Sequence, residues 1–186
     1  KKEGSQARML FASSVATYGN TIAEKPPVRV DHSQSAVDIY GETKIESERL
    51  MIASGLPYTI LRISGISIPA FLEPPEVWPF MHDQRIEFVN RADVLTALFA
   101  SVQQDAAANK VLNIAGGETW RMLGHEYAKA LCDILGMSDE DTSYRDTAGW
   151  CDFYDTDESQ ALPDYQQTSF PRFLELLDKA VEEALG

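Results

Sequence analysis

Residues 9–19 read MLFASSVATYG, a short apolar run that ends in two serines and leaves through a glycine. The run Met9–Ala12 is typical of a strand in a parallel sheet, because such strands are covered on both faces and show no polar alternation. Ser13 and Ser14 follow directly after it. The stretch therefore predicts a buried strand that runs out into a loop.

A helix and a second strand are expected next. The proline pair at 26–27 excludes helix from the loop after the first strand. Residues 37–54 contain no helix breaker after Gly41, and a glycine and a proline directly beyond them supply the stop. The segment Tyr58–Ser64 reads YTILRIS, which is β-branched and apolar. A strand, a helix and a strand in this order indicate βαβ units, a parallel sheet and the α/β fold class.

The remaining sequence predicts an excursion from the sheet and several further elements. Residues 65–80 are irregular and contain four prolines. The elements expected after them are a strand over Arg85–Asn90, a helix capped by Asp93, a strand over residues 110–117, a helix over Leu123–Leu135 ended by Gly136, and a last helix starting near Ser169 and Pro171. One face of the helix after Asp93 carries Val94, Leu95, Leu98, Phe99 and Val102, and the last helix is expected to bury Phe173, Leu174, Leu177, Val181 and Leu185.

Composition limits both the size of the protein and its partners. At 186 residues and 44% hydrophobic content, the chain is long enough for one domain, or for one lobe and part of another. The formal charge of −13 disfavours nucleic acid and anionic membranes as partners, because both require clustered basic residues. No apolar run approaches the roughly 20 residues that would span a bilayer.

The cysteines and histidines are few and scattered along the chain. Cys132 and Cys151 form no CxxC pair, so we expect reduced thiols and a cytoplasmic location. The three histidines, His32, His82 and His125, show no metal-ligand spacing. No metal site is therefore expected.

Residues 40–44 read YGETK and raise the possibility of a catalytic pair. The i, i+4 spacing places Tyr40 and Lys44 on one face of the predicted helix. A phenol with a reference pKa near 10 is a poor base at neutral pH, and a nearby ammonium group favours the phenolate. An ordinary exposed pair on a helix is the alternative, and a Tyr-x-x-x-Lys match by itself is weak.

The context of this motif resembles a known family. The blocks SSVATYG, YGETKIESERL, GLPYTILRISGI, FVNRADVLTAL and KVLNIAGGE occur in the order found in the extended short-chain dehydrogenase/reductase family, also called the NAD-dependent epimerase/dehydratase family. The resemblance covers essentially the whole chain, beginning at the family's fifth strand. It implies the C-terminal part of a Rossmann-type parallel sheet with a small α+β substrate lobe.

The glycine-rich turn of the family is missing from this sequence. Gly116 and Gly117 follow a predicted strand but lack the third glycine of a phosphate-binding turn. We therefore expect the C-terminal portion of a longer enzyme, inactive by itself. Residues 1–65 and 91–117 would form half of the dinucleotide-binding domain, and residues 66–90 and 118–186 the substrate-binding lobe.

The resemblance also implies roles for single residues. Tyr40 would be the acid/base of a hydride transfer, Lys44 its helper and a ligand of the nicotinamide ribose, and Ser14 the donor to the reacting substrate oxygen. Ser13 either supports the strand end or contacts the cofactor. Ser64 and Gly65 would offer backbone groups to the cofactor.

Substrate recognition is less determined. Nucleotide-sugar members of the family that the sequence resembles commonly carry a diphosphate-binding arginine at the position that matches Ile86. The neighbouring Arg85 is expected on the opposite face of the strand, which weakens a nucleotide-sugar assignment. Arg145 corresponds to a second phosphate-binding arginine or is an ordinary loop residue. The three tryptophans, Trp78, Trp120 and Trp150, line a pocket or fill the core.

The expected parent protein is an NAD- or NADP-dependent epimerase/dehydratase or reductase acting on a sugar, a nucleotide sugar or a related small molecule. The resemblance implies a homodimer formed through the Tyr-x-x-x-Lys helix. One alternative is a non-catalytic dinucleotide-sensing or scaffold member of the same fold, which fold alone does not exclude. Another is a stable association module whose first strand has an exposed edge.

Overall fold

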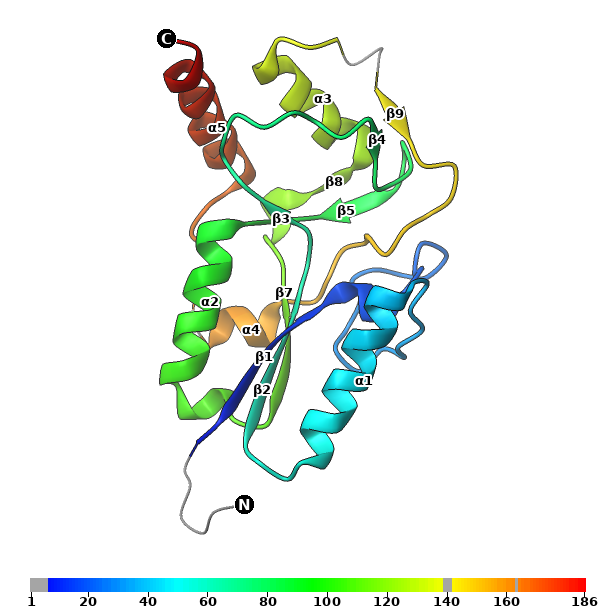
Figure 1. The fold of residues 1–186 in the computed structure, drawn as a ribbon, viewed down its shortest axis with the longest axis vertical. Coiled ribbons are helices and arrows are strands. Elements are labelled where there is room, and N and C mark those ends of the chain that lie inside the picture. The colour runs from blue at the N-terminus through cyan, green and yellow to red at the C-terminus, as the bar shows by residue number, and fades with distance from the viewer. Residues whose placement is uncertain (1–6, 139–141, 163) are drawn as a thin grey trace.

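The computed structural model describes residues 7–138, 142–162 and 164–186 and contains a three-stranded parallel sheet (Figure 1). Its strands are β1 (Met9–Ser14), β2 (Tyr58–Ile63) and β7 (Lys110–Ile114), in the order β1-β2-β7. Helix α1 (Ile39–Ala53) lies on one side of this sheet and α2 (Arg91–Gln103) on the other. The predicted α/β class with a parallel sheet is confirmed.

Helix α1 begins where its cap residue allows. The Asp38 carboxylate accepts a hydrogen bond from the Gly41 backbone N–H at 2.7 Å. Asp38 is therefore the N-cap residue, and Ile39 is the first residue of the helix. Residue 41 is a glycine because the helix touches the turn after β1. A Cβ at this position would lie 2.8 Å from the Ala16 carbonyl oxygen and 2.7 Å from the Ala36 Cβ.

The start of α2 differs from the prediction. Asn90, not Asp93, is the N-cap residue, and Asp93 lies in the first turn. The Asp93 carboxylate accepts hydrogen bonds from the backbone N–H and the hydroxyl of Thr168, at 3.0 and 2.9 Å. Burial raises the pKa of this carboxyl group, and the bonds from Thr168 oppose the rise. Asp93 therefore anchors a distant segment instead of capping its own helix.

The predicted apolar face of α2 is only partly covered. Val94 is buried, but Leu95, Phe99 and Val102 are 60%, 66% and 61% exposed. These three residues follow the i, i+4, i+7 spacing of one helix face, so they form a continuous exposed apolar stripe.

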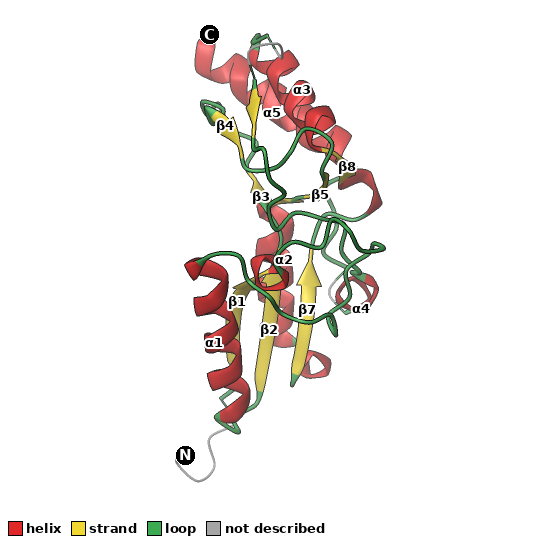
Figure 2. Ribbon diagram, turned by 90° about the vertical axis from the view of Figure 1, so that its right-hand side faces the viewer, coloured by secondary structure: helices red, strands yellow, loops and turns green. Residues whose placement is uncertain are grey.

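A smaller lobe of short strands and two helices stands beside the carboxyl end of the sheet (Figures 1 and 2). Its elements are β3 (Ile66–Ser67), β4 (Val77–Trp78), β5 (Arg85–Glu87), β6 (Val89–Asn90), β8 (Arg121–Leu123), α3 (Gly124–Leu135), β9 (Ser143–Tyr144) and α5 (Phe170–Leu185). Short helical turns occur at η1 (Val15–Tyr18), η2 (Asp105–Ala107), η3 (Glu118–Trp120) and α4 (Asp157–Ala161).

The predicted strand over residues 85–90 divides in two at Phe88. Its first part, β5, pairs antiparallel with β8, whereas its second part, β6, pairs parallel with β3. The end of α3 agrees with the prediction, since Gly136 adopts the left-handed conformation with φ of 67°.

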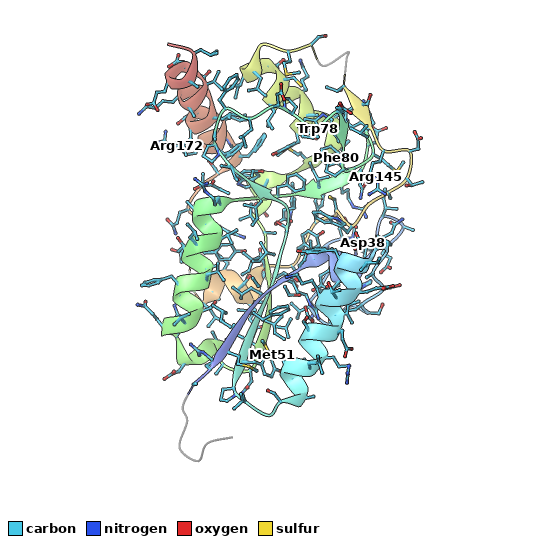
Figure 3. All side chains as sticks on the ribbon, viewed as in Figure 1. Asp38, Met51, Trp78, Phe80, Arg145 and Arg172 are labelled. Atoms are coloured by element: carbon cyan, nitrogen blue, oxygen red, sulfur yellow. The ribbon has the colours of Figure 1, made fainter. Side chains whose placement is uncertain are left out.

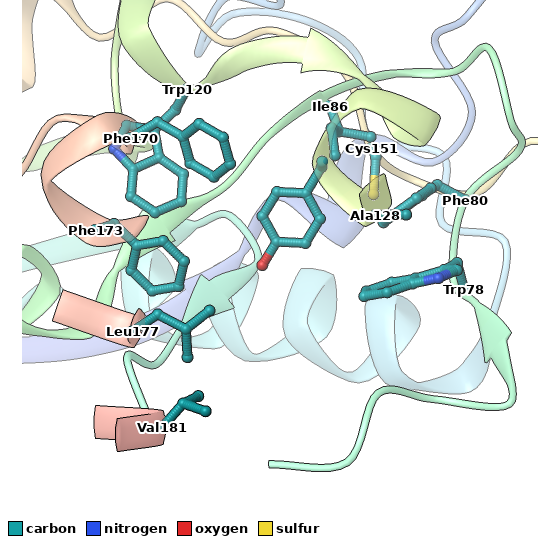
Figure 4. Packing of buried hydrophobic residues seen from close by; sticks show 11 residues of the cluster. Trp78, Phe80, Ile86, Trp120, Ala128, Cys151, Phe170, Phe173, Leu177 and Val181 are labelled. Carbon is teal, nitrogen blue, oxygen red and sulfur yellow. The ribbon is translucent and has the colours of Figure 1, made fainter. Parts of the chain in front are cut away.

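Aromatic side chains form the core of the small lobe, and Figure 4 shows how they pack. Trp120 lies 5.1 Å from both Phe170 and Phe173 between ring centroids. Phe173, Leu177 and Val181 of α5 are buried as predicted. Leu185 is 71% exposed, which differs from the prediction, because the last turn of α5 extends beyond this core.

Part of the later chain returns to the sheet. Helix α4 contacts β7, and Tyr165 is buried with Leu61 and Leu112 of the sheet. The Tyr165 hydroxyl also donates to the Ala115 carbonyl oxygen at 2.8 Å. These residues belong to the range 118–186 that the sequence assigns to the small lobe, and that division of the chain stays a prediction.

A buried ion pair joins α1 to the sheet. The Arg62 guanidinium donates to the Glu48 carboxylate at 2.7 Å, with 7% and 3% of the two side chains exposed. Glu48 also accepts from the Ser13 hydroxyl at 2.5 Å and from Gln34 at 2.9 Å. Burial alone lowers the pKa of the Arg62 guanidinium, but its bonds to Glu48 and Tyr18 outweigh this effect and raise it.

Removing the Glu48 carboxylate should destabilise the fold strongly. In Glu48→Ala the Arg62 cation stays buried without its partner, and we expect the free energy of unfolding to fall by about 3–5 kcal/mol. Urea denaturation followed by circular dichroism measures this loss. The matched control is Glu46→Ala on the same helix, where the partner Arg49 is exposed, and no loss is expected. Equal stabilities of the two variants would contradict the structural role of the pair.

Candidate active site

A cavity of about 530 Å³ opens at the carboxyl ends of β1 and β2. Its lining includes Ser13, Ser14, Tyr40, Lys44, Ser64 and Trp150. The volume lies in the range of sites for small molecules, and parallel sheets commonly bind ligands at this edge. The sheet and α1 together bring all three residues predicted to be catalytic, Ser14, Tyr40 and Lys44, to this cavity.

Tyr40 and Lys44 lie one helical turn apart on α1 and both line the cavity. Tyr40 is 52% exposed, and its hydroxyl has no hydrogen-bond partner among the described residues. The Lys44 Nζ atom lies 5.4 Å from the centroid of the Tyr40 ring and donates to the Ala12 carbonyl oxygen at 2.8 Å. One bond to the end of β1 thus fixes the cation beside the phenol.

Ser14, the last residue of β1, lines the same cavity. Its hydroxyl oxygen accepts a hydrogen bond from the Ala16 N–H at 3.1 Å, which caps the helical turn η1. The hydroxyl proton has no acceptor among the residues that the structure describes. Ser14 can therefore donate a hydrogen bond to a molecule in the cavity.

Ser13 and Ser64 contrast with each other. The Ser13 hydroxyl donates to Glu48 in the interior, which favours the supporting role over a contact with a cofactor. The Ser64 hydroxyl is buried without a hydrogen-bond partner, and Ser64 lines the cavity. A buried polar atom of this kind calls for a partner, which a bound molecule can supply.

Gly65 follows Ser64 and takes part in close packing. A Cβ at this position would lie 2.5 Å from the Phe88 ring, so a larger residue would displace either the ring or the loop. The Gly65 carbonyl oxygen accepts a hydrogen bond from the Val89 N–H at 2.9 Å. The loop after β2 is thereby held against the strand that leads into α2.

The two predicted substrate-binding arginines do not line this cavity. The Arg85 guanidinium forms two bonds to the buried Asp152 carboxylate, at 2.7 and 3.0 Å, which raise the pKa of Arg85. Arg145 is exposed near β9 in the small lobe, as Figure 3 shows, whereas Asp38 lies at the start of α1 beside the cavity. Substrate contacts for either arginine stay a prediction.

Of the three tryptophans, one lines the pocket and two fill the core. Trp150 lines the cavity, whereas Trp78 and Trp120 belong to the aromatic core of the small lobe. Glu48 and Arg62 position α1, and the sequence analysis assigned neither of them a role. A glutamate on the sheet-facing side of a helix and an arginine within an apolar strand were the available signals.

The histidines are scattered along the chain but not all in space. His82 and His125 stack with ring centroids 4.4 Å apart, beside Asp83. Their separation of 43 residues gave the spacing argument no means of pairing them. Both cysteines are buried, and neither forms a disulfide bond.

Comparisons with known proteins identify the fold. No protein-family model matches the sequence. A stretch of 63 residues, 32% of this chain, is 38% identical to UDP-glucose 4-epimerase of Lactobacillus helveticus and spans 18% of that protein. Solved structures match over nearly the whole chain.

A Thermotoga maritima UDP-glucose 4-epimerase with UDP-glucose matches 96% of this chain with a TM-score of 0.77 and 18% identity. An Agrobacterium tumefaciens short-chain dehydrogenase/reductase superfamily protein with bound NAD also matches 96%, with a TM-score of 0.77 and 16% identity. The dTDP-glucose 4,6-dehydratase of Bacillus anthracis in complex with NAD matches 95%, with a TM-score of 0.77 and 14% identity.

The chain has the fold of these three proteins. It spans 64%, 68% and 62% of their respective lengths. The Rossmann-type fold expected from the resemblance is confirmed. Among the described helices, none is both long and apolar enough to cross a membrane.

The two serines allow a test of the site's geometry. Ser64→Ala removes a buried hydroxyl that has no partner, so we expect the free energy of unfolding to stay the same or rise. Ser13→Ala removes a buried bond to a carboxylate and should lower it by about 1–3 kcal/mol. Chemical denaturation of both variants provides the comparison. A loss in Ser64→Ala as large as that in Ser13→Ala would show that the Ser64 hydroxyl is already satisfied.

Proposed function

We propose that this chain forms the catalytic part of an NAD- or NADP-dependent epimerase, dehydratase or reductase that acts on a hydroxyl or carbonyl group of a sugar, a nucleotide sugar or a related small molecule. The observation that carries the proposal is the convergence of Ser14, Tyr40 and Lys44 on one cavity at the carboxyl edge of a parallel sheet. Their order and spacing match the family that the sequence resembles. Relatives with this fold include sugar-nucleotide epimerases and dehydratases.

Each of the three residues has a proton-related role in this chemistry. Tyr40, as phenolate, takes the proton of the substrate hydroxyl, and as phenol it returns a proton to the carbonyl oxygen. The Lys44 ammonium, held by Ala12, favours the phenolate electrostatically. The Ser14 hydroxyl donates a hydrogen bond to the reacting oxygen and so holds it in place. The nicotinamide cofactor, when bound, accepts or donates the hydride.

The residues present suit the nicotinamide end of such a cofactor. Lys44 has further N–H donors besides the one used by Ala12, and Ser64 presents an unsatisfied buried hydroxyl at the cavity. These two residues and the backbone at Gly65 would hold the ribose and the ring. The sequence contains no Gly-x-x-Gly-x-x-Gly turn for the pyrophosphate.

Two adjoining surfaces support the presence of a separate dinucleotide-binding half. Among the described strands, β1 is paired on one side only, by β2. Helix α2, with its exposed stripe of Leu95, Phe99 and Val102, contacts β1 and is tied to it by bonds from Arg8. A strand that extends the sheet and a helix on the stripe would cover both. We propose that a further segment or a partner chain supplies them.

The homodimer implied by the resemblance also stays a proposal. Ile39 and Leu50 of α1 are exposed by 78% and 56%, and they would contribute apolar contacts between two such helices. Sedimentation over a concentration series is the measurement that distinguishes monomer from dimer.

The 186-residue chain alone should bind NADH and NADPH too weakly to saturate at micromolar concentrations, because it lacks residues for the pyrophosphate. Energy transfer from the tryptophans to the reduced nicotinamide measures this binding. Adding a dinucleotide-binding half, in cis or as a separate chain, should restore saturable binding. Micromolar affinity of the isolated chain would contradict the need for that half.

Replacing Tyr40 by Phe removes the hydroxyl and keeps the ring. In a protein that includes the dinucleotide-binding half, we expect Tyr40→Phe to lower kcat by at least about a hundredfold, the usual contribution of a general acid/base. The dissociation constant for NADH should change little, since no cofactor contact of that hydroxyl is required. Phe11, whose ring also lies under Lys44, provides a control: Phe11→Leu should keep most of the activity.

Unchanged turnover of Tyr40→Phe would exclude the catalytic role. Saturable dinucleotide binding by a protein that turns over neither sugars nor nucleotide sugars would instead favour the sensing or scaffold alternative.

A further inference from the structure

The turn between β4 and β5 meets the start of α3 at a cluster of three metal-ligating side chains, His82, Asp83 and His125. One ligand atom from each residue lies within 4.8 Å of the others. His82 and Asp83 are exposed and His125 is half-buried. None of the three lines the candidate active site. The cluster is therefore separate from the chemistry proposed above.

The backbone holds these two segments together. The His125 N–H donates to the His82 carbonyl oxygen, and the Gly124 N–H donates to the Gln84 carbonyl oxygen, both at 2.9 Å. A Cβ at Gly124 would lie 2.5 Å from the Met81 carbonyl oxygen, so only glycine allows α3 to approach this closely. The relative position of the two histidines is thus set by the packing of the lobe.

Gln84 fixes the turn from the inside. Its side chain is fully buried and donates to the carbonyl oxygens of Gly149 and Cys151, at 3.1 and 2.8 Å. Its Oε1 atom accepts from the Met81 N–H at 3.1 Å, which closes the turn across His82 and Asp83. Buried hydrogen bonds thus hold the backbone of the turn, while the side chains of His82 and Asp83 remain exposed. Pre-positioned ligands lose little conformational freedom when an ion binds.

The donor atoms converge on one carboxylate oxygen. The Nδ1 atoms of His82 and His125 lie 2.6 and 3.3 Å from the Asp83 Oδ1 atom. The two imidazole rings stack with an angle of 14° between their planes, and the His125 Nδ1 atom also lies 3.1 Å from the His82 carbonyl oxygen. The His82 ring also packs edge-on against Tyr144, with centroids 5.2 Å apart.

These separations are close to those around a single ion. Two ligands on a tetrahedral zinc ion, with bonds of about 2.0–2.1 Å, lie roughly 3.3 Å apart. The His125 to Asp83 distance already has this value, and an ion on the His125 Nδ1 atom would replace the bond of that atom to the His82 carbonyl oxygen. The shorter His82 to Asp83 distance must open by a fraction of an ångström. Both adjusting side chains are exposed, so this movement meets little packing resistance.

We infer that His82, Asp83 and His125 bind a divalent transition-metal ion, of which zinc is the expected one. Two imidazole nitrogens and one carboxylate oxygen form a ligand set preferred by zinc, copper and nickel over magnesium or calcium. Three protein ligands leave a fourth position for water. The formal charge of −13 further favours cation binding. The ion would join the β4–β5 turn to α3 and so stabilise the small lobe.

The test is a calorimetric titration of chelator-treated protein with zinc chloride in a non-coordinating buffer. We expect one saturable site, with affinity lowered at least tenfold in His82→Ala, in His125→Ala and in Asp83→Asn. His32→Ala is the matched control, because His32 pairs with Glu24 outside the cluster, and it should keep the wild-type affinity. Far-UV circular dichroism without metal confirms that each variant is folded.

Two further measurements separate this site from nonspecific binding. With Cu²⁺ as the probe, electron paramagnetic resonance should show two coordinating nitrogens in the wild type and one in either histidine variant. Zinc should raise the melting temperature of the wild type but not that of His125→Ala. Equal zinc affinity of the wild type and the folded His82→Ala and His125→Ala variants would overturn the inference, as would no saturable binding at millimolar zinc.

Discussion

The buried ion pair between Arg62 and Glu48 is the interaction on which the arrangement of the sheet and α1 depends. Taking two charges out of water is costly, and the cost is offset only where each charge has several well-placed partners. Glu48 accepts from Arg62, Ser13 and Gln34, and Arg62 also donates to Tyr18, whose hydroxyl donates to Asn113 on β7. All three sheet strands and α1 contribute to this network. None of these elements can shift without leaving a buried charge or hydroxyl unpaired.

The same network fixes the position of the candidate active site. Glu48 lies one helical turn after Lys44, so the bond that anchors the middle of α1 also sets the direction of the Tyr40 and Lys44 side chains. At the other end of the helix, Gly41 permits close contact with the turn after β1, and Asp38 fixes the first helical residue. Tyr40 is thus held between two fixed points, while its hydroxyl remains open to the cavity. A rigid support around an exposed reactive group is what positioned acid/base chemistry requires.

The small lobe is held together mainly by the packing of aromatic side chains. Aromatic rings fill its interior, and the buried carboxylates of Asp152 and Glu87 pair with Arg85 on β5 and Arg121 on β8. Arg85, predicted to bind substrate, thereby has a clear structural use. The histidine cluster lies where the β4–β5 turn meets α3, and a bound ion would add a cross-link between these two segments, which already touch.

Sequence alone determined the local features of this protein. Apolar runs placed the three sheet strands, glycine marked the end of α3, and the i, i+4 spacing put Tyr40 and Lys44 on one helix face, because such patterns depend only on neighbouring residues. The tertiary structure decided which faces are covered and which distant groups meet. In the structure Val94 is buried but Phe99 is exposed. The Asp93 carboxylate accepts a hydrogen bond from Thr168, Arg85 pairs with Asp152, and His82 stacks on His125. Periodicity records that a face is apolar but not what lies against it, and contacts between residues far apart in sequence exist only once the whole chain has packed.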